Sequence, residues 1–182
     1  MALDPDKVDE NLEILLTAIE TYNAEQSYDE YRIRLGAGDP AWSSRVKDHE
    51  LYPLEYRRFV ERIGWLEYSP GYLGLHVFIE PLRLGDLQED NEKGSNLEVE
   101  LCLGRQNPPS SVAEWAEIEG ISDHLLLAED PCSYAYVALD KSTSPYSLTE
   151  LIEEKQCDSF LGFVVTQLYH PLHNRPLPLR TL

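Results

Sequence analysis

Residues 51–64, LYPLEYRRFVERIG, constrain the fold of this chain more than any other stretch. Their apolar side chains recur close to the i, i+4, i+7 spacing of one helix face, and the charged ones fall elsewhere. The apolar set is Leu54, Phe59, Val60 and Ile63. Pro53 has the fixed φ that suits the first helical position, and Gly64 tolerates the positive φ that ends many helices. The stretch therefore predicts a short amphipathic helix between Pro53 and Gly64.

The residues after this helix predict an aromatic turn and then a strand. Trp65, Tyr68 and Tyr72 follow closely, and Pro70-Gly71 marks a turn. From 73 to 84 the residues become β-branched and aromatic, with a break at Pro81. Helix, turn and strand together form one local folding unit.

Two further helices are predicted from their caps and their apolar faces. Asp4-Pro5 begins the first, which should run to about Asn23, and Asp158-Ser159 begins the last. The first face consists of Val8, Leu12, Leu15, Leu16 and Ile19, and the last of Phe160, Leu161, Val164, Val165 and Leu168. Between the first two helices, 28–35 is interpreted as a second helical piece and 36–44 as a loop.

The later half of the chain alternates as strands do. Leu97 to Leu103 alternates with polar residues and is expected to lie antiparallel to 73–84. A short helix capped by Ser110 or Ser111 follows. Next come an apolar run at 125–127, a turn at 129–131, a strand at 133–140 and a turn at 141–145. The predicted fold class is α+β, an antiparallel or mixed sheet of about five or six strands with three main helices packed against it.

The order of these motifs resembles the SUKH superfamily, a large group of bacterial toxin-immunity proteins that also contains a yeast cell-wall-synthesis regulator. The residues that match its opening motif are Pro53, Tyr56, Arg57, Phe59, Ile63, Gly64 and Trp65. An apolar strand, an acidic turn, a Tyr-rich strand ending in Asp140 and a closing Ser-Phe-Leu helix then follow in the family's order. Where the family often has glycines in the acidic turn, this chain has Pro131-Cys132-Ser133.

The resemblance covers roughly 51–168 and implies a binding domain. The domain is expected to span 1–169, and 86–120 looks like an insert enlarged relative to the compact form of the family. The proline-rich segment 170–182 is predicted to be an extended or disordered tail without helix.

Composition limits the functions to consider. The chain of 182 residues is 42% hydrophobic, which suits one folded domain. With 33 acidic and 15 basic residues its net charge is −18, so it should repel nucleic acid. Twelve of the acidic residues but only two basic ones fall between Asp86 and Asp130. This charge serves solubility or steers a basic partner.

The expected location is the cytoplasm. No apolar run is long enough to cross a membrane, and the first residues lack the pattern of a secretory signal. Cys102, Cys132 and Cys157 are odd in number and far apart, which suits reduced, buried thiols.

No catalytic constellation, cofactor site or metal site is predicted. His170 and His173 lie in the proline-rich tail, where a shared metal lacks a nearby acidic ligand. Cys132 with His124 would suit a nucleophile and base, but an unrelated pair is the simpler interpretation. Glu98 and Glu100 share a strand face, where solvated charge is more common than glycoside chemistry.

We therefore expect a non-catalytic binding protein, with an immunity protein against a cognate toxin, such as a basic nuclease, as the leading hypothesis. The candidate contacts follow from charge and aromatic placement: Tyr68, Tyr72, Glu98, Glu100, Glu114 and Glu117. The tyrosines of the turn suit core packing and partner contact equally. The alternatives are a regulatory or scaffold protein, and a hydrolase that uses Cys132 and His124.

Overall fold

The fold is known from a computed structural model that describes residues 4–37, 40–68, 75–86, 117, 120–130, 135–151, 155–156 and 158–172. Its helices are α1 (Pro5–Glu25), α2 (Pro40–Lys47), α3 (Leu54–Arg62), α7 (Phe160–Gln167) and α8 (Tyr169–Leu172). Two 3-10 turns are η1 (Asp29–Tyr31) and η2 (Leu84–Asp86). The strands are β1 (Arg34–Gly36), β2 (Trp65–Tyr68), β3 (Leu75–Arg83), β4 (Leu125–Asp130), β5 (Ala135–Asp140), β6 (Ser147–Glu150) and β7 (Lys155–Gln156).

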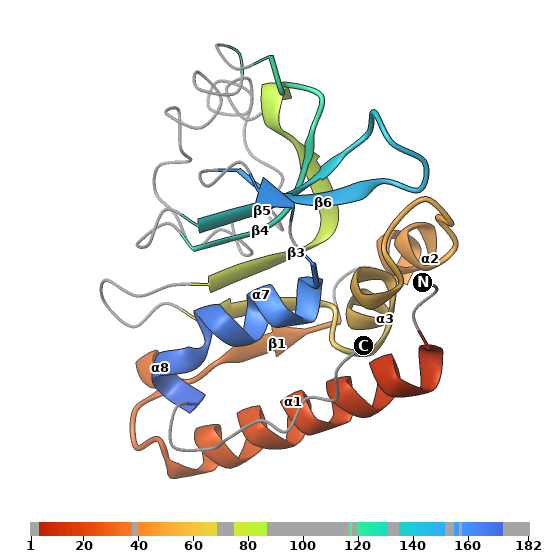
Figure 1. Ribbon diagram of the computed structural model, residues 1–182. Coiled ribbons are helices and arrows are strands. Elements are labelled where there is room, and N and C mark those ends of the chain that lie inside the picture. Colours follow the sequence, from red (N-terminus) through yellow and green to blue (C-terminus); the bar gives the residue numbers. More distant parts are fainter. Residues whose placement is uncertain are drawn as a thin grey trace.

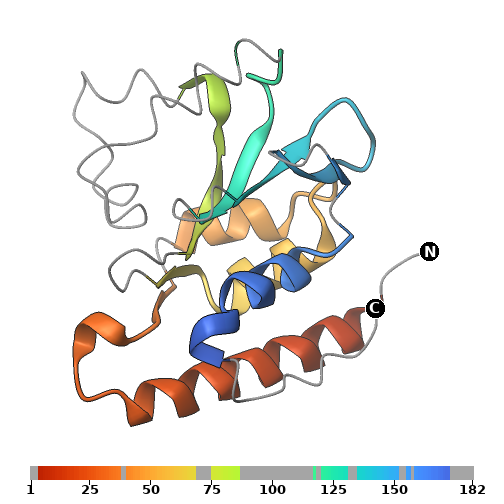
Figure 2. The same ribbon diagram turned by 60° about the vertical axis from the view of Figure 1, so that its left-hand side comes forward.

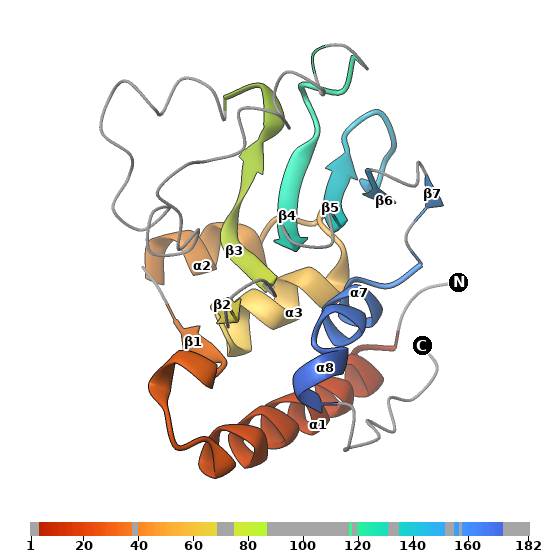
Figure 3. The ribbon, with the colours of Figure 1, turned by 90° about the vertical axis from the view of Figure 1, so that its left-hand side faces the viewer.

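The strands form a single antiparallel sheet of seven strands, ordered as they occur in the chain, β1 to β7. Figure 3 shows β3, β4 and β5 side by side in this order. The register between β3 and β4 shifts between Val77 and Leu82, the part of β3 that contains Pro81. The predicted α+β class is confirmed, with a sheet one strand larger than the expected upper limit.

The core lies between one face of this sheet and the helices. The sheet contributes Leu66, Val77, Ala128, Val137 and Leu148. The apolar faces predicted for the first and last helices meet them, with Val8, Leu12, Leu15, Ile19, Phe160, Leu161, Val164 and Leu168 all buried. Figures 1 and 2 show α7 and α8 lying along α1, on the side of α1 that faces the sheet. The helices pack on the apolar face of the sheet, because each layer of an α+β fold buries its apolar side against the other.

Both predicted helix caps are present. The Asp4 carboxylate accepts a hydrogen bond from the Asp6 amide at 3.1 Å, with Pro5 at the first helical position. The Ser159 hydroxyl accepts one from the Gly162 amide at 2.9 Å. Each cap satisfies an amide that the helix itself cannot pair.

Glu55 of α3, more than a hundred residues earlier in the sequence, adds a second cap to α7. Its carboxylate is buried and accepts hydrogen bonds from the Ser159 hydroxyl at 2.9 Å and from the Leu161 amide at 3.3 Å. The carboxylate thus lies at the positive end of the α7 dipole, where negative charge is stabilised. Burial nevertheless raises the pKa of Glu55, and the bonds from Ser159 and Leu161 oppose that shift.

The neighbouring residue, Tyr56, joins α3 to the sheet. Its hydroxyl lies 2.8 Å from the Phe78 carbonyl oxygen and 3.1 Å from that of Ile79, both in β3. Its ring packs edge-to-face on Phe160 with centroids 5.2 Å apart. The first turn of α3 therefore holds both α7 and β3 in place.

Gly64 ends α3 as predicted, with φ of +85°. A Cβ at this position would lie 2.0 Å from the Gly36 carbonyl oxygen, and one on Gly36 would lie 2.4 Å from the Trp65 ring. The two glycines let β1 approach the end of α3 closely. Both the conformation and the space at Gly64 require a residue without a side chain.

Two predictions between α1 and α3 are wrong, and the predicted start of α3 differs by one residue. The segment 28–35 is not helical beyond the short turn η1 and enters β1 at Arg34. Its strand pairing with β2 comes from residues distant in sequence, which local pattern cannot detect. The expected loop 36–44 gives way to α2 at Pro40, which has the φ of a first helical position. Pro53 precedes α3 as its cap, so that helix begins one residue later than predicted.

Two more predictions at the chain's second half are wrong. The turn expected at 129–131 does not begin at Glu129, because β4 continues to Asp130. The tail predicted to lack helix from 170 on contains α8, which ends at the buried Leu172. Pro171 fits because the first turn of a helix leaves amides unpaired in any case.

Several predictions lie outside the described residues. These are the strand at 97–103, nearly all of the insert 86–120 and the rest of the tail, 173–182. The strand at 97–103 was expected beside β3, whose neighbours among the described strands are β2 and β4. Of the short helix after Ser111, Glu117 is described and is helical.

The buried Glu55 carboxylate can be tested by two substitutions. Glu55→Ala should lower the free energy of unfolding by about 2–3 kcal/mol, because it removes the acceptor for Ser159 and Leu161. Glu55→Gln keeps an acceptor oxygen and should stay within about 1 kcal/mol of the wild type at neutral pH. Urea unfolding measures both. Equal losses in the two variants would contradict the capping role.

The pH dependence of the same unfolding gives an independent readout. The folded-state pKa of Glu55 is raised above the ordinary 4.5, so the folded state binds the proton more tightly than the unfolded state. The stability due to this group is fully present below pH 4.5 and is lost as the pH rises through the raised pKa. We expect the free energy of unfolding of Glu55→Gln to fall less than that of the wild type as the pH rises through this range.

Gly64 offers a matched pair of glycine variants. Gly64→Ala should destabilise the fold by at least about 3 kcal/mol, because the new Cβ meets the Gly36 carbonyl. Gly120 also has a positive φ, +72°, but open space around it. Gly120→Ala should therefore cost only about 1 kcal/mol. Thermal unfolding of both variants separates the steric contact from the backbone conformation, and equal losses would argue against the contact.

Candidate functional site

The most exposed aromatic side chains of the described residues lie in the connection from α1 to β1. Tyr28 is 66% exposed and Tyr31 is 43% exposed, and among the described residues no other large hydrophobic side chain is classed as exposed. We call residues 26–33, which contain both, the tyrosine loop. Exposed tyrosines on a rigid support are typical anchors of protein interfaces.

Asn23 closes the tyrosine loop at its base. Its side-chain amide donates to the Ile33 carbonyl oxygen at 2.8 Å, and its carbonyl oxygen accepts from the Ile33 amide at 2.8 Å. Ile33 itself is buried. A helix residue thus holds both backbone groups of the residue just before β1. This clamp fixes the two ends of the loop next to each other.

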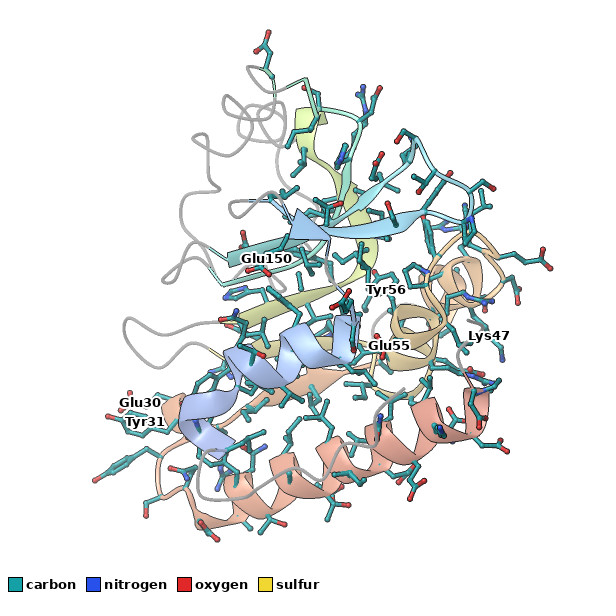
Figure 4. The ribbon with its side chains drawn as sticks, in the orientation of Figure 1. Glu30, Tyr31, Lys47, Glu55, Tyr56 and Glu150 are labelled. Atoms are coloured by element: carbon teal, nitrogen blue, oxygen red, sulfur yellow. The ribbon has the colours of Figure 1, made fainter. Side chains whose placement is uncertain are left out.

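Within the loop, the backbone of η1 sets the positions of the two rings. The Tyr31 amide donates to the Tyr28 carbonyl oxygen at 3.2 Å, and the rings meet edge-to-face with centroids 6.2 Å apart. Arg32 pairs with Asp29 at 2.9 Å and also donates to the Gln26 carbonyl oxygen at 3.3 Å. Figure 4 shows Glu30 and Tyr31 pointing away from the body of the protein at the end of α1. Contacts within the loop therefore define its conformation.

The charges of α1 differ between its two ends. Near its beginning, Asp9 and Glu13 pair with Arg62, and Asp9 lies 3.8 Å from Arg58. These ion pairs with α3 offset the charges of Asp9 and Glu13, although exposed pairs add little stability. At the other end, the tyrosine loop adds Asp29 and Glu30 beside its two rings. Figure 4 shows Lys47 of α2 on the opposite side of the protein from Tyr31.

The structure describes two of the six contact residues expected from the sequence. Tyr68 is only 6% exposed, and its ring packs edge-to-face on Tyr22 with their hydroxyls 3.4 Å apart. Burial and the Tyr22 hydroxyl raise the pKa of Tyr68. Of the two roles left open for it, this environment favours packing. Glu117 is exposed and suits a surface contact.

The other four lie outside the described residues, namely Tyr72, Glu98, Glu100 and Glu114. Sequence reasoning missed the tyrosine loop because it interpreted 28–35 as helical. A usable signal is present in SYDEYR, where the two tyrosines are the only apolar side chains and two acidic residues separate them. Such a segment has little apolar surface to bury.

A second cluster of chemical groups crosses the sheet. Residues directly opposite one another on β1 to β4 form what we call the charged row: Arg34, Glu67, His76 and Glu129. Their neighbours Leu66, Val77 and Ala128 point into the core, so the row lies on the other face of the sheet. Glu67, His76 and Glu129 are 9%, 3% and 0% exposed. A histidine between two carboxylates can act in acid–base chemistry, but this one is closed to solvent.

Only one of the two residues of the hydrolase alternative lies in the described part of the chain. His124 lies 3.9 Å from Asp140, and Cys132, its partner in the hydrolase alternative, lies outside the described residues. A hydrogen bond from Ser142 lowers the pKa of Asp140, as expected for a surface turn. In the described part of the chain no group of three possible metal ligands occurs. No described helix is long and apolar enough to cross a membrane.

Comparisons of the chain with protein-family models, with curated proteins and with solved structures found no match. The tyrosine loop is therefore identified by its geometry alone: exposed rings, a closed base and acidic neighbours.

Asn23 is the residue whose loss should loosen the loop. Asn23→Ala removes both hydrogen bonds to Ile33, so we expect a loss of about 1–3 kcal/mol and faster amide hydrogen exchange at Ile33. Thr21→Ala is the matched control, because the Thr21 hydroxyl bonds within α1, to the Thr17 carbonyl oxygen at 2.7 Å. Unchanged exchange at Ile33 in Asn23→Ala would show that the clamp does not hold the loop.

Proposed function

We propose that this chain is a non-catalytic binding domain that captures a basic protein through its tyrosine loop. In its leading form, the proposal is an immunity protein that neutralises a cognate toxin by stoichiometric contact. The single observation that carries it is the exposure of Tyr28 and Tyr31 on a loop that Asn23 holds closed. The motif resemblance to the SUKH superfamily points to a toxin as the partner.

The order of the loop is what makes it suitable for binding. Binding costs free energy when side chains and loops must be ordered, and a loop that is already ordered avoids much of that cost. Tyrosine rings supply a large contact area with few rotatable bonds. Tyr28 and Tyr31 already rest against each other at 6.2 Å, so a partner would meet a formed surface.

Charge supplies the second part of the proposed mechanism. A net charge of −18 attracts a basic protein from a distance and raises the rate of association. If the partner is a basic nuclease, acidic side chains such as Glu30 would take the place of substrate phosphates in its cleft. The toxin would then be blocked by occlusion, without any bond being made or broken.

The first partner to test is the protein encoded by the neighbouring reading frame, in particular any basic C-terminal domain. We expect a 1:1 complex with a dissociation constant of about 1 nM by isothermal titration calorimetry. Association should slow by at least about tenfold between roughly 0.05 M and 0.5 M salt, measured by stopped flow. The bound partner should lose its activity in proportion to the chain added.

Three results would count against this function. Binding to several basic proteins with micromolar constants would favour the scaffold alternative. Turnover of a substrate by the purified chain, lost on substitution of Cys132 or His124, would favour the hydrolase. A complex that leaves the partner fully active would contradict neutralisation, even if binding were tight.

A further inference from the structure

We propose that the tyrosine loop recognises an arginine side chain, so that the partner surface is defined by arginine and not by positive charge in general. This inference deepens the proposed function and rests on it. It concerns Tyr28 and Tyr31, whose rings are in contact, and Glu30, which Figure 4 shows beside Tyr31 near the end of α1.

The two rings leave aromatic surface open. They stand at 75° to each other with the edge of one toward the other, and 66% of Tyr28 and 43% of Tyr31 remain accessible. A guanidinium group is planar and weakly hydrated, and it lies readily on the face of a tyrosine ring. A lysine ammonium group is a compact, strongly hydrated charge that gains less from such a surface.

The carboxylates complete the site. Asp29 already holds an arginine of this chain, because Arg32 pairs with it at 2.9 Å. Glu30 lies next to it in sequence, and within the described residues it forms no ion pair. A carboxylate can accept two parallel hydrogen bonds from a guanidinium, which lysine cannot provide. The guanidinium of the incoming arginine would therefore lie on a tyrosine ring and donate two hydrogen bonds to the Glu30 carboxylate.

Peptides test the inference without the natural partner. We would titrate the full chain with a capped Gly-Arg repeat peptide and with the Gly-Lys peptide of the same length and charge, at low salt. The arginine peptide should bind about fivefold more tightly. Amide chemical shifts in ¹⁵N spectra should change in residues 26–33.

Four variants separate the parts of the site. Tyr28→Ala and Tyr31→Ala should reduce the arginine preference to about onefold, whereas Tyr31→Phe keeps an aromatic face and should retain it. Glu30→Gln should weaken binding of the arginine peptide. Asp6→Asn is the matched charge control, since Asp6 is exposed at the other end of α1, about 30 Å away for a helix of this length. It should leave the preference unchanged.

Equal affinity of the wild type for the two peptides would overturn the inference, and so would no measurable binding of the arginine peptide. A preference that persists in both alanine variants would overturn it too. These outcomes are distinct from failure of the proposed function. Tight capture of a basic protein that is insensitive to Tyr28→Ala and Tyr31→Ala would remove the arginine site and keep the function. An arginine preference in a chain that captures no basic protein would keep the arginine site and remove the proposed function.

Discussion

The fold depends on the carboxylate of Glu55 at the beginning of α7. This one group connects α3 with α7, across more than a hundred residues of sequence. Tyr56 beside it reaches the backbone of β3, so two adjacent residues hold a helix and a strand at once. The arrangement buries a carboxyl group, which burial alone would disfavour. It is tolerated because Ser159 and Leu161 supply hydrogen bonds at a point where the helix has unpaired donors.

Much of this architecture follows from local sequence signals. α1, α3 and α7 each combine an identifiable start with a one-sided apolar pattern, and all three were predicted. α2 was missed because it has little such pattern, with Val46 as its buried apolar residue among those described. β1 was missed for a different reason. It is three residues long and owes its conformation to β2 and to the Asn23 clamp, neither of which is local.

The candidate site was harder to predict than the fold. Composition indicates that an acidic, tyrosine-rich exterior exists, but exposure depends on tertiary packing. Tyr68 and Tyr31 look alike in sequence, yet Tyr68 lies in the core beside Tyr22 and Tyr31 stands in solvent. Charge is also redistributed by the fold. Asp9 and Glu13 of α1 are matched by arginines of α3, and Asp29 of the tyrosine loop is matched by Arg32, whereas Glu30 accompanies the exposed rings. Net charge alone therefore overstates how much of the surface can attract a partner.

The charged row has a consequence for how the strands find their places. Neighbouring residues in a strand point to opposite faces, so a slip of one residue by β3 would carry His76 into the apolar core and bring Val77 out between Glu67 and Glu129. Misaligned sheets are thereby penalised twice, through a polar group stranded among aliphatic side chains and through carboxylates left facing a valine. The charged row thus helps to fix the register of the neighbouring strands. It selects one pairing of strands among those that hydrophobic burial alone would permit.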